Sequence, residues 1–172
     1  MKETNFFYML DVANEKLKKF FRQQRRESIK NRKGAILLVD DFKEQEELLR
    51  YMLDVKKYPN DLVVARGARE AKAIIKKTAD DLRIVIIDIE LFGVNNNIYG
   101  IDLMRWMDDN YPDIPYIVLT GRQDVVPFIE ENIPGVDVIV KGKNTINDFA
   151  DAIGLIDTSY GGNYVPEDKN QI

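Results

Sequence analysis

The sequence predicts an α/β protein that has a five-stranded parallel sheet and one extra amphipathic helix at its amino end. Three observations predict this class. Five short apolar segments alternate with five amphipathic segments of helical length, as in parallel strands joined by crossover helices. Residues 83–91, RIVIIDIEL, are apolar at most positions, which is typical of a strand buried on both faces. Residues 4–29 carry instead a helical stripe of apolar side chains.

The composition fits one globular domain with an added element. The chain has 172 residues, of which 45% are hydrophobic and 31% are charged. It has no apolar stretch of membrane-spanning length and no secretory signal at its amino end, so we expect a cytoplasmic protein without membrane contact. The absence of His and Cys excludes imidazole acid–base chemistry and thiolate or imidazole metal sites. Any bound metal is therefore expected to be a hard cation held by oxygen atoms.

The predicted amino-terminal helix covers residues 4–29 and carries a heptad-like stripe. The stripe ends after Phe21, because polar residues take the next positions. We favour self-association as the way in which the stripe is covered, ahead of docking on the chain's own body or recruitment of another protein. The stripe consists of Phe6, Leu10, Ala13, Leu17 and Phe20.

Charge is divided unevenly along the chain. Residues 1–33 have 10 Lys or Arg and 4 Asp or Glu, a net charge of +6, whereas the remaining residues have 15 and 25, a net charge of −10. A basic arm can bind nucleic acid, but a solvated helix face is the more common explanation. The acidic body argues against a nucleic-acid-binding core.

The body of the chain begins after a polar joint at residues 31–34. Residues 35–39 are apolar and are followed by two aspartates, which predicts a strand. Residues 42–57 place apolar side chains three and four positions apart, which predicts a helix. A short strand at residues 62–65 and a helix at residues 68–77 repeat this unit.

Three more strand–helix units complete the body. Pro127 falls in the first turn of one predicted helix, where proline is tolerated. Residues 91–99, with Gly93 and three consecutive asparagines, predict a loop. We expect a helical extension in residues 1–33, the α/β body in residues 34–157 and a flexible tail in residues 158–172. The remaining strands are residues 83–89, 116–119 and 136–140, and the remaining helices are residues 100–109, 124–132 and 145–156.

Polar side chains close four of the five predicted strands. Asp40 and Asp41 follow the first strand, Asp88 lies near the end of the third, Thr120 follows the fourth and Lys141 follows the fifth. In the flavodoxin-like doubly wound order 2-1-3-4-5, these ends share one crevice. Three carboxylates repel one another unless a divalent cation neutralises them, which predicts an Mg²⁺ site. With a hydroxyl and an ammonium opposite, the set suits phosphoryl transfer to Asp88.

Each of these residues also has an ordinary structural explanation. An aspartate after a strand commonly caps a helix, Thr120 followed by Gly121 is a common turn, and a single lysine is most often a surface residue. Two further Asp-Asp pairs, at residues 80–81 and 108–109, do not follow apolar strands. Only the combination, in this strand order, indicates a site.

Five stretches of the body together resemble the receiver domain of two-component response regulators, over residues 34–157. They are ILLVDDF (36–42), IVIIDIEL (84–91), YGIDLMRWM (99–107), YIVLTG (116–121) and VDVIVKG (136–142). The resemblance implies that Asp88 is the phosphoacceptor. It further implies that Asp41 binds Mg²⁺ directly, that Asp40 binds it through water, and that the Glu90 backbone carbonyl completes the metal ligands.

The same resemblance implies how the signal enters and leaves. Thr120 would bond the phosphoryl group and Lys141 would pair with it. The donor would be a histidine of a partner kinase or phosphotransfer protein, since this chain has no histidine. About 15 residues follow the last predicted helix, so we expect a stand-alone receiver that is not an enzyme and that acts through protein–protein contacts.

The sequence departs from the receiver pattern around the expected site. Phe92 stands where a proline is usual, and the loop after it is long. Val138 replaces the usual aromatic residue on the fifth strand, so the usual switch is absent or rerouted. Glu90 and Arg122 occupy positions that tune dephosphorylation in the family. We expect these two side chains to pair across the site and to alter the lifetime of the phosphoryl group.

Two other functions compete with phosphoacceptance. A degenerate receiver would serve only as a scaffold or oligomerisation module. An Mg²⁺-dependent phosphohydrolase with an aspartyl-phosphate intermediate would need a second aspartate two residues after Asp88, where this chain has Glu90. A nucleotide site is disfavoured, because the stretch GKNT at residues 142–145 has no glycine at position 137. The cognate kinase, the signal and the downstream partner are not encoded in any recognisable motif.

Overall fold

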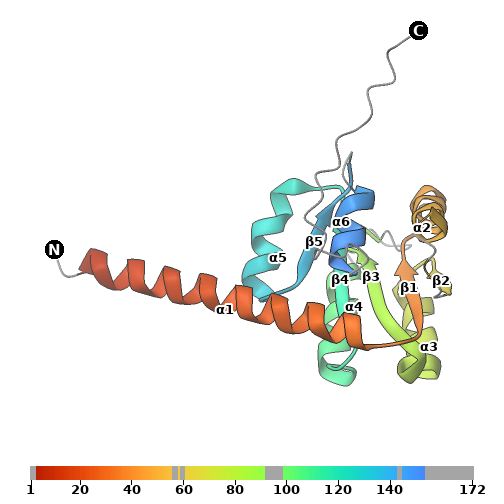
Figure 1. Cartoon of the computed structure of the whole chain (residues 1–172), viewed down its shortest axis with the longest axis horizontal. Helices are drawn as coiled ribbons and strands as arrows, with labels where there is room; N and C mark the ends of the chain where they lie inside the picture. Colours follow the sequence, from red (N-terminus) through yellow and green to blue (C-terminus); the bar gives the residue numbers. More distant parts are fainter. Residues whose placement is uncertain (1–2, 56–57, 59–60, 92–98, 143–144, 154–172) are drawn as a thin grey trace, which may run out of the picture.

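The computed structural model has the predicted five-stranded parallel sheet, in the order β2-β1-β3-β4-β5 (Figure 1). It describes residues 3–55, 58, 61–91, 99–142 and 145–153, without the side chains of residues 3–12, 99 and 146. The doubly wound fold class predicted from the strand–helix alternation is confirmed. The strands are β1 (Ala35–Val39), β2 (Leu62–Ala65), β3 (Leu82–Asp88), β4 (Tyr116–Thr120) and β5 (Asp137–Val140).

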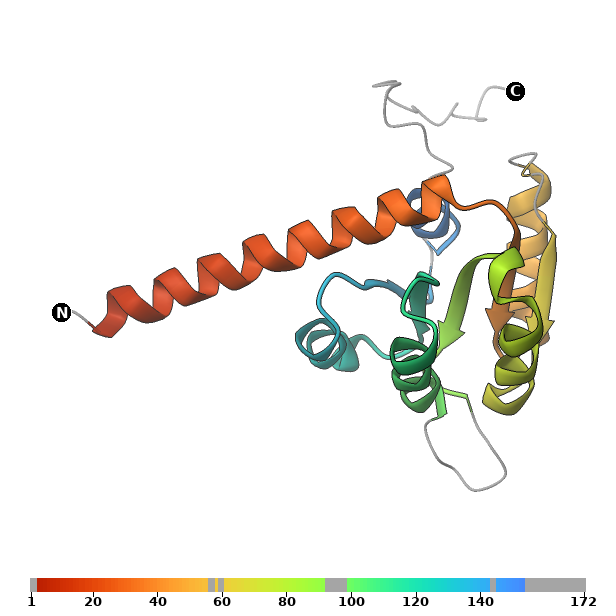
Figure 2. The same ribbon diagram turned by 90° about the horizontal axis from the view of Figure 1, so that it is seen from below.

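Helices cover both faces of the sheet, and one long helix crosses beside it (Figures 1 and 2). Two short 3-10 turns were not predicted. Ala79–Asp81 lies between the predicted helix at residues 68–77 and the predicted strand at residues 83–89, and Gln123–Val125 overlaps the start of the predicted helix at residues 124–132. No helix of the described residues is long and apolar enough to cross a membrane. The helices are α1 (Glu3–Asn31), α2 (Lys43–Val55), α3 (Ala68–Thr78), α4 (Tyr99–Asn110), α5 (Val126–Asn132) and α6 (Thr145–Ala152).

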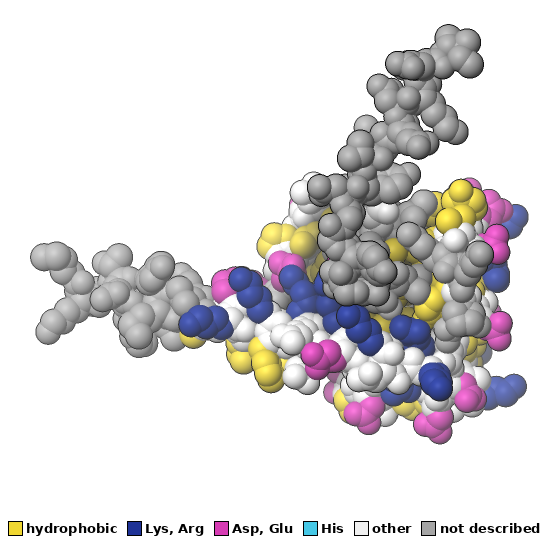
Figure 3. Space-filling model, viewed as in Figure 1, with side chains coloured by type: hydrophobic (Ala, Val, Ile, Leu, Met, Phe, Trp, Pro, Cys, Tyr) yellow, Lys and Arg dark blue, Asp and Glu magenta, His cyan; other side chains and the backbone are white. Residues whose placement is uncertain are grey.

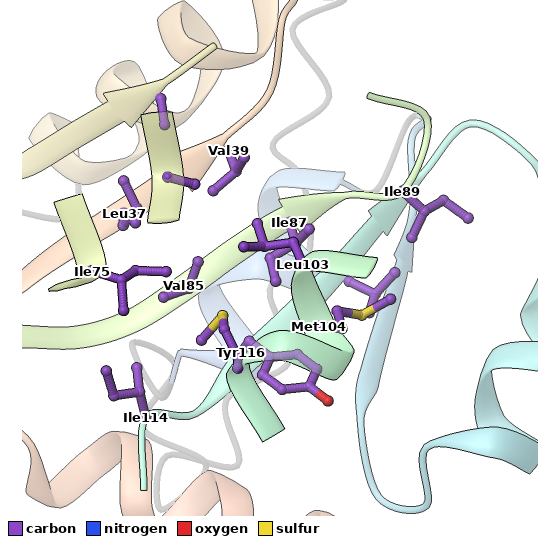
Figure 4. Packing of buried hydrophobic residues seen from close by; sticks show 14 of the residues in the cluster. Leu37, Val39, Ile75, Val85, Ile87, Ile89, Leu103, Met104, Ile114 and Tyr116 are labelled. Atoms are coloured by element: carbon purple, nitrogen blue, oxygen red, sulfur yellow. The ribbon is translucent and has the colours of Figure 1, made fainter. Parts of the chain in front are cut away.

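Alternate residues of the central strands supply two separate cores. Leu37 and Val39 of β1 face one core, whereas Ile36 and Leu38 face the other, as the period of two in a strand requires. The first core is completed by α3, α4 and α5 (Figure 4). The second is completed by α2, α6 and Ile29 of α1. This two-sided burial is why the strands read as continuous apolar segments.

The strand ends differ slightly from the prediction, and the differences bear on the site. β3 ends at Asp88, so Ile89 lies beyond the strand. β4 includes Thr120, which the prediction placed just after it. Pro127 lies in the first turn of α5 as predicted. The predicted loop at residues 91–99 and the predicted tail fall largely outside the described residues.

The carboxyl half of α1 is docked on the chain's own body. Ile29 is 1% exposed and belongs to the second core. The Arg26 guanidinium donates two hydrogen bonds to the Asp137 carboxylate, at 3.0 and 2.9 Å. At Gly135, an added Cβ would lie 2.4 Å from Phe21 Cβ, so the turn before β5 packs directly against the helix. These contacts fix α1 to the amino end of β5.

The amino half of α1 extends away from the body in both views (Figures 1 and 2). Leu17 is 51% exposed and Phe20 is 55% exposed, and Ala13 is exposed as well. These members of the predicted stripe are therefore largely exposed, although Leu17 also lines a cavity shared with Pro127 and Glu130 of α5. Figure 3 shows a row of Lys and Arg side chains along α1. Phe6 and Leu10 lie on α1, but their side chains are outside the described residues.

Candidate functional site

Strand register brings the predicted residues to one end of the sheet. Asp40 directly follows β1, and Asp88 is the last residue of β3. Asp88 pairs with Leu119 of β4, and Thr120 pairs with Val140 of β5. Lys141 directly follows β5, and its N–H donates a hydrogen bond to the Thr120 carbonyl at 2.8 Å. Because all strands are parallel, these carboxyl ends form the edge at which open α/β sheets bind ligands.

Lys141 joins the two buried carboxylates of the site. Its Nζ lies 2.6 Å from Asp88 Oδ2 and 3.2 Å from Asp40 Oδ2. Both aspartates are 0% exposed, whereas the lysine side chain keeps 18% of its surface. One ammonium thus faces two buried carboxylates, so the site has one more acid than base.

The pKa shifts follow from this charge arrangement. Burial raises the pKa of the Asp40 carboxyl, although the Phe42 N–H and the Lys141 ammonium oppose the rise. Burial lowers the pKa of Lys141, but the hydrogen bond and charge of Asp88, together with Asp40, outweigh burial and leave its pKa raised. Lys141 therefore stays protonated, and the free-energy cost of burying charge falls on the carboxylate of Asp40.

Asp41 supplies a third carboxylate and an unsatisfied oxygen. One oxygen from each of Asp40, Asp41 and Asp88 lies within 4.8 Å of the others. Asp41 Oδ1 is buried and has no hydrogen-bond partner among the described residues. Such an oxygen is costly unless a cation binds it. Carboxylate oxygens converging in this way suit a hard divalent cation such as Mg²⁺, so the residues present fit the predicted metal.

Backbone N–H groups orient the two buried aspartates. The Phe42 N–H donates to Asp40 Oδ1 at 2.8 Å, and the Glu90 N–H donates to Asp88 Oδ1 at 3.0 Å. The Oδ2 atom of each carboxylate is then left for Lys141. Gly100 of α4 packs on the same strand end, because an added Cβ would come within 2.5 Å of the Asp88 carbonyl oxygen.

Glu90 and Arg122 do not pair with each other, contrary to expectation. Glu90 Oε2 accepts a hydrogen bond from the Gly121 N–H at 2.7 Å. The Arg122 guanidinium instead bonds Asp124, at 3.2 and 2.6 Å. The reason is local: Asp124 lies two residues from Arg122 in the same turn, so a short contact is available without crossing the site. Thr120 is 0% exposed, and its hydroxyl oxygen accepts the Arg122 N–H at 3.0 Å.

A cavity of about 430 Å³ opens beside Asp88. The Phe42 ring lies 5.6 Å from Lys141 Nζ. The sequence analysis did not single out Phe42, although its position directly after the Asp-Asp pair could have indicated a role in the site. Arg66 was also missed. Its guanidinium donates to the Asp40 carbonyl at 3.2 Å and pairs with Glu46, which holds the loop after β1. The cavity is lined by Phe42, Glu44, Gln45, Asp88, Glu90 and Lys141.

Val138, which stands where receivers usually have an aromatic residue, is partly buried and packs against the first core. A valine fills this position with much less volume than an aromatic ring. Phe92, the other departure after Asp88, lies outside the described residues.

Comparison with solved structures finds response regulators. The bacteriophytochrome response regulator AtBRR is 26% identical, with a TM-score of 0.59 over 72% of this chain and 91% of that chain. A receiver domain protein from Clostridium thermocellum is 23% identical, with a TM-score of 0.58 over 70% and 91% of the two chains. TrrA from Thermotoga maritima, solved in complex with Mg²⁺ and BeF, is 23% identical, with a TM-score of 0.56 over 72% and 99%.

Sequence comparison gives the same answer over most of the chain. No curated protein matches the sequence closely enough to be counted as a relative. A family model, however, described as the response regulator receiver domain, matches residues 36–153. That span contains the sheet, apart from Ala35 at the start of β1, and every residue of the candidate site. The chain therefore belongs to the response regulator receiver domain family.

Proposed function

We propose that this protein is a phosphoacceptor in which Asp88 receives a phosphoryl group, with Mg²⁺ bound by Asp40, Asp41, Asp88 and the Glu90 backbone carbonyl. The observation that carries the proposal is the position of Lys141 Nζ, between Asp88 and Asp40 and beside three converging carboxylates. A structural ion pair needs one acid for one base. The surplus of acid supports a site that takes up a cation and then a phosphoryl group.

The transfer step forms an O–P bond and breaks an N–P bond. One carboxylate oxygen of Asp88 attacks the phosphorus of a phosphohistidine on a kinase or phosphotransfer protein. The electron pair of the broken bond stays on the imidazole nitrogen of the donor. Lys141 balances the charge on Asp88 and the transferred oxygens, and Thr120 can donate a hydrogen bond to one of them. Mg²⁺, when bound, supplies further positive charge for the transferring group.

The output is proposed to be a change in protein–protein contacts rather than a chemical product. A phosphoryl group adds charge beside Thr120 and Lys141, which shifts the balance between conformations of the nearby loops.

We further propose that the chain has three parts: a helical extension (1–33), the receiver (34–157) and a tail (158–172). The exposed Leu17 and Phe20 support a homodimer formed through the exposed apolar side chains of α1.

Phosphorylation by a small-molecule donor tests the proposed acceptor. We expect acetyl phosphate with Mg²⁺ to increase the intact mass of the wild-type chain by one phosphoryl group, and chelation of Mg²⁺ to abolish the increase. Asp88→Asn should prevent the modification, because an amide is not a competent nucleophile. Asp54→Asn is the matched control, since Asp54 is an exposed aspartate outside the cluster. A modified Asp88→Asn variant would refute the assignment.

The lifetime of the phosphoryl group is proposed to depend on Glu90 and Arg122. Glu90 lines the cavity beside Asp88, and Arg122 follows Thr120 by two residues. We propose that these side chains alter the approach of water to phosphorus. We expect Glu90→Ala and Arg122→Ala to change the dephosphorylation rate of the isolated protein. Unchanged rates in both variants would remove this part of the proposal.

A further inference from the structure

The contact between Glu90 and Gly121 joins two strand ends of the candidate site. The Glu90 N–H bonds Asp88 Oδ1, which fixes this residue directly beside the proposed phosphoacceptor. Its side chain then reaches to the neighbouring strand end, where Oε2 accepts the Gly121 N–H at 2.7 Å. The carboxylate of Glu90 therefore connects the ends of β3 and β4, the two strands that carry Asp88 and Thr120.

The chain is built to allow this close approach. An added Cβ at Gly121 would lie 2.9 Å from Glu90 Oε2, so a larger residue would displace the carboxylate. A hydrogen bond from a backbone N–H to an ionised carboxylate is stronger than one between neutral groups. The Gly121 N–H is thus an anion-binding donor that already has an anion.

We propose that the Glu90 carboxylate is an internal anion, which occupies the Gly121 N–H while Asp88 is unmodified and is displaced when Asp88 carries a phosphoryl group. The inference rests on the proposed function and concerns its regulation. Asp88, Glu90 and Lys141 line the same cavity. A phosphoryl group brings between one and two negative charges, roughly, into this cavity beside the carboxylate.

The displacement follows from charge repulsion and from competition for one donor. Two anions that line one cavity repel each other, although solvent screens part of this repulsion because the bond between Glu90 and Gly121 is exposed. When the Glu90 carboxylate leaves, the Gly121 N–H becomes available to a phosphoryl oxygen, and the released side chain changes the surface next to β4. The hydrogen bond between Glu90 and Gly121 therefore opposes binding of the phosphoryl group, and it is broken when the phosphoryl group binds.

Beryllofluoride binding to the full chain tests the inference, because this trigonal anion adds to an aspartate without chemistry on phosphorus. With Mg²⁺ present, we expect Glu90→Ala to bind beryllofluoride at least about tenfold more tightly than wild type, as expected when a charge-assisted hydrogen bond no longer competes. Glu90→Gln should fall between the two, since it keeps an oxygen acceptor but loses the charge.

Glu44 provides the matched control. It lines the same cavity and carries the same charge, whereas the Gly121 N–H is bonded to Glu90. Glu44→Ala should tighten beryllofluoride binding only about two- to threefold, through the general loss of one negative charge. Equal effects of Glu44→Ala and Glu90→Ala, or an unchanged or weaker affinity in Glu90→Ala, would overturn the inference.

The amide resonance of Gly121 gives a second readout that does not depend on phosphorylation. It should move in the ligand-free Glu90→Ala variant and should move again in wild type when beryllofluoride binds. A Gly121 resonance that ignores the loss of Glu90 would also overturn the inference. A wild-type protein that binds no beryllofluoride would contradict the proposed function instead, so the two failures are distinct.

Discussion

Replacing Asp40 with asparagine should make the metal-free protein more stable while weakening its metal site. Asp40 is fully buried, and burial raises the pKa of its carboxyl, which means that the ionised form destabilises the fold at neutral pH. Asparagine has nearly the same shape, and its side-chain oxygen can still accept the Phe42 N–H. After the substitution Lys141 keeps Asp88 at 2.6 Å, so the ammonium then faces one buried carboxylate instead of two.

The size of the gain follows from two opposing terms. Burying an ionised carboxylate costs several kcal/mol, and the charged hydrogen bond from Lys141 offsets about 1.5–3 kcal/mol of that cost. We therefore expect the free energy of unfolding of Asp40→Asn to exceed that of wild type by about 1–2 kcal/mol in the presence of chelator. Mg²⁺ at ten times its dissociation constant should stabilise wild type by about 1.4 kcal/mol, and the variant by much less.

Urea unfolding, with and without Mg²⁺, measures both effects. The advantage of the variant should shrink as the pH is lowered toward the raised pKa of Asp40, because protonation then neutralises the wild-type side chain as well. Asp124→Asn is the control: Arg122 lowers the pKa of Asp124, so no gain is expected there. A variant that is less stable than wild type in chelator, or equally stabilised by Mg²⁺, would refute the reasoning.

Three further predictions concern α1 and the first core. Ile29→Ala should lower the free energy of unfolding by about 2–5 kcal/mol in urea denaturation, because Ile29 is buried in the second core. Leu17→Lys should abolish any dimer seen by light scattering and leave the unfolding free energy of the isolated chain nearly unchanged, since Leu17 is exposed. Burial raises the pKa of Tyr116 far above its unfolded value of about 10, and the carboxylate of Asp108 adds to the rise. Its contribution to stability is therefore complete below about pH 10 and lost as the pH rises further, so Tyr116→Phe should weaken the loss of stability in base.

The fold could be predicted because, while the edge strands β2 and β5 are partly buried, its three central strands, β1, β3 and β4, are buried on both faces. Such strands read as uninterrupted apolar segments, and their alternation with helices leaves few topologies. The boundaries were less exact. The 3-10 turns at Ala79–Asp81 and Gln123–Val125 depend on local backbone geometry that hydrophobic periodicity does not encode.

The positions of the candidate residues could be predicted from strand order, because residues at parallel strand ends must converge. The partners of flexible side chains could not. Glu90 can reach several groups from the end of β3, and only the position of the Gly121 N–H, with no Cβ in the way, decides its contact. Arg66 was overlooked for the same reason: its partners are the Asp40 backbone carbonyl and the Glu46 side chain, and neither contact is encoded in the residue pattern.

The two halves of α1 illustrate the same limit at larger scale. Its apolar stripe was visible because helical periodicity is local, yet the stripe is not what docks the helix. The docked half relies on Arg22 and Arg26, which pair with Glu130 and Asp137, partners that lie 108 and 111 residues away in the chain. A basic helix face is normally solvated, so only the acidic groups that meet it distinguish an anchor from a surface. One helix therefore has an anchored basic half, whose role depends on distant residues, and a projecting apolar half, whose exposure still calls for a partner.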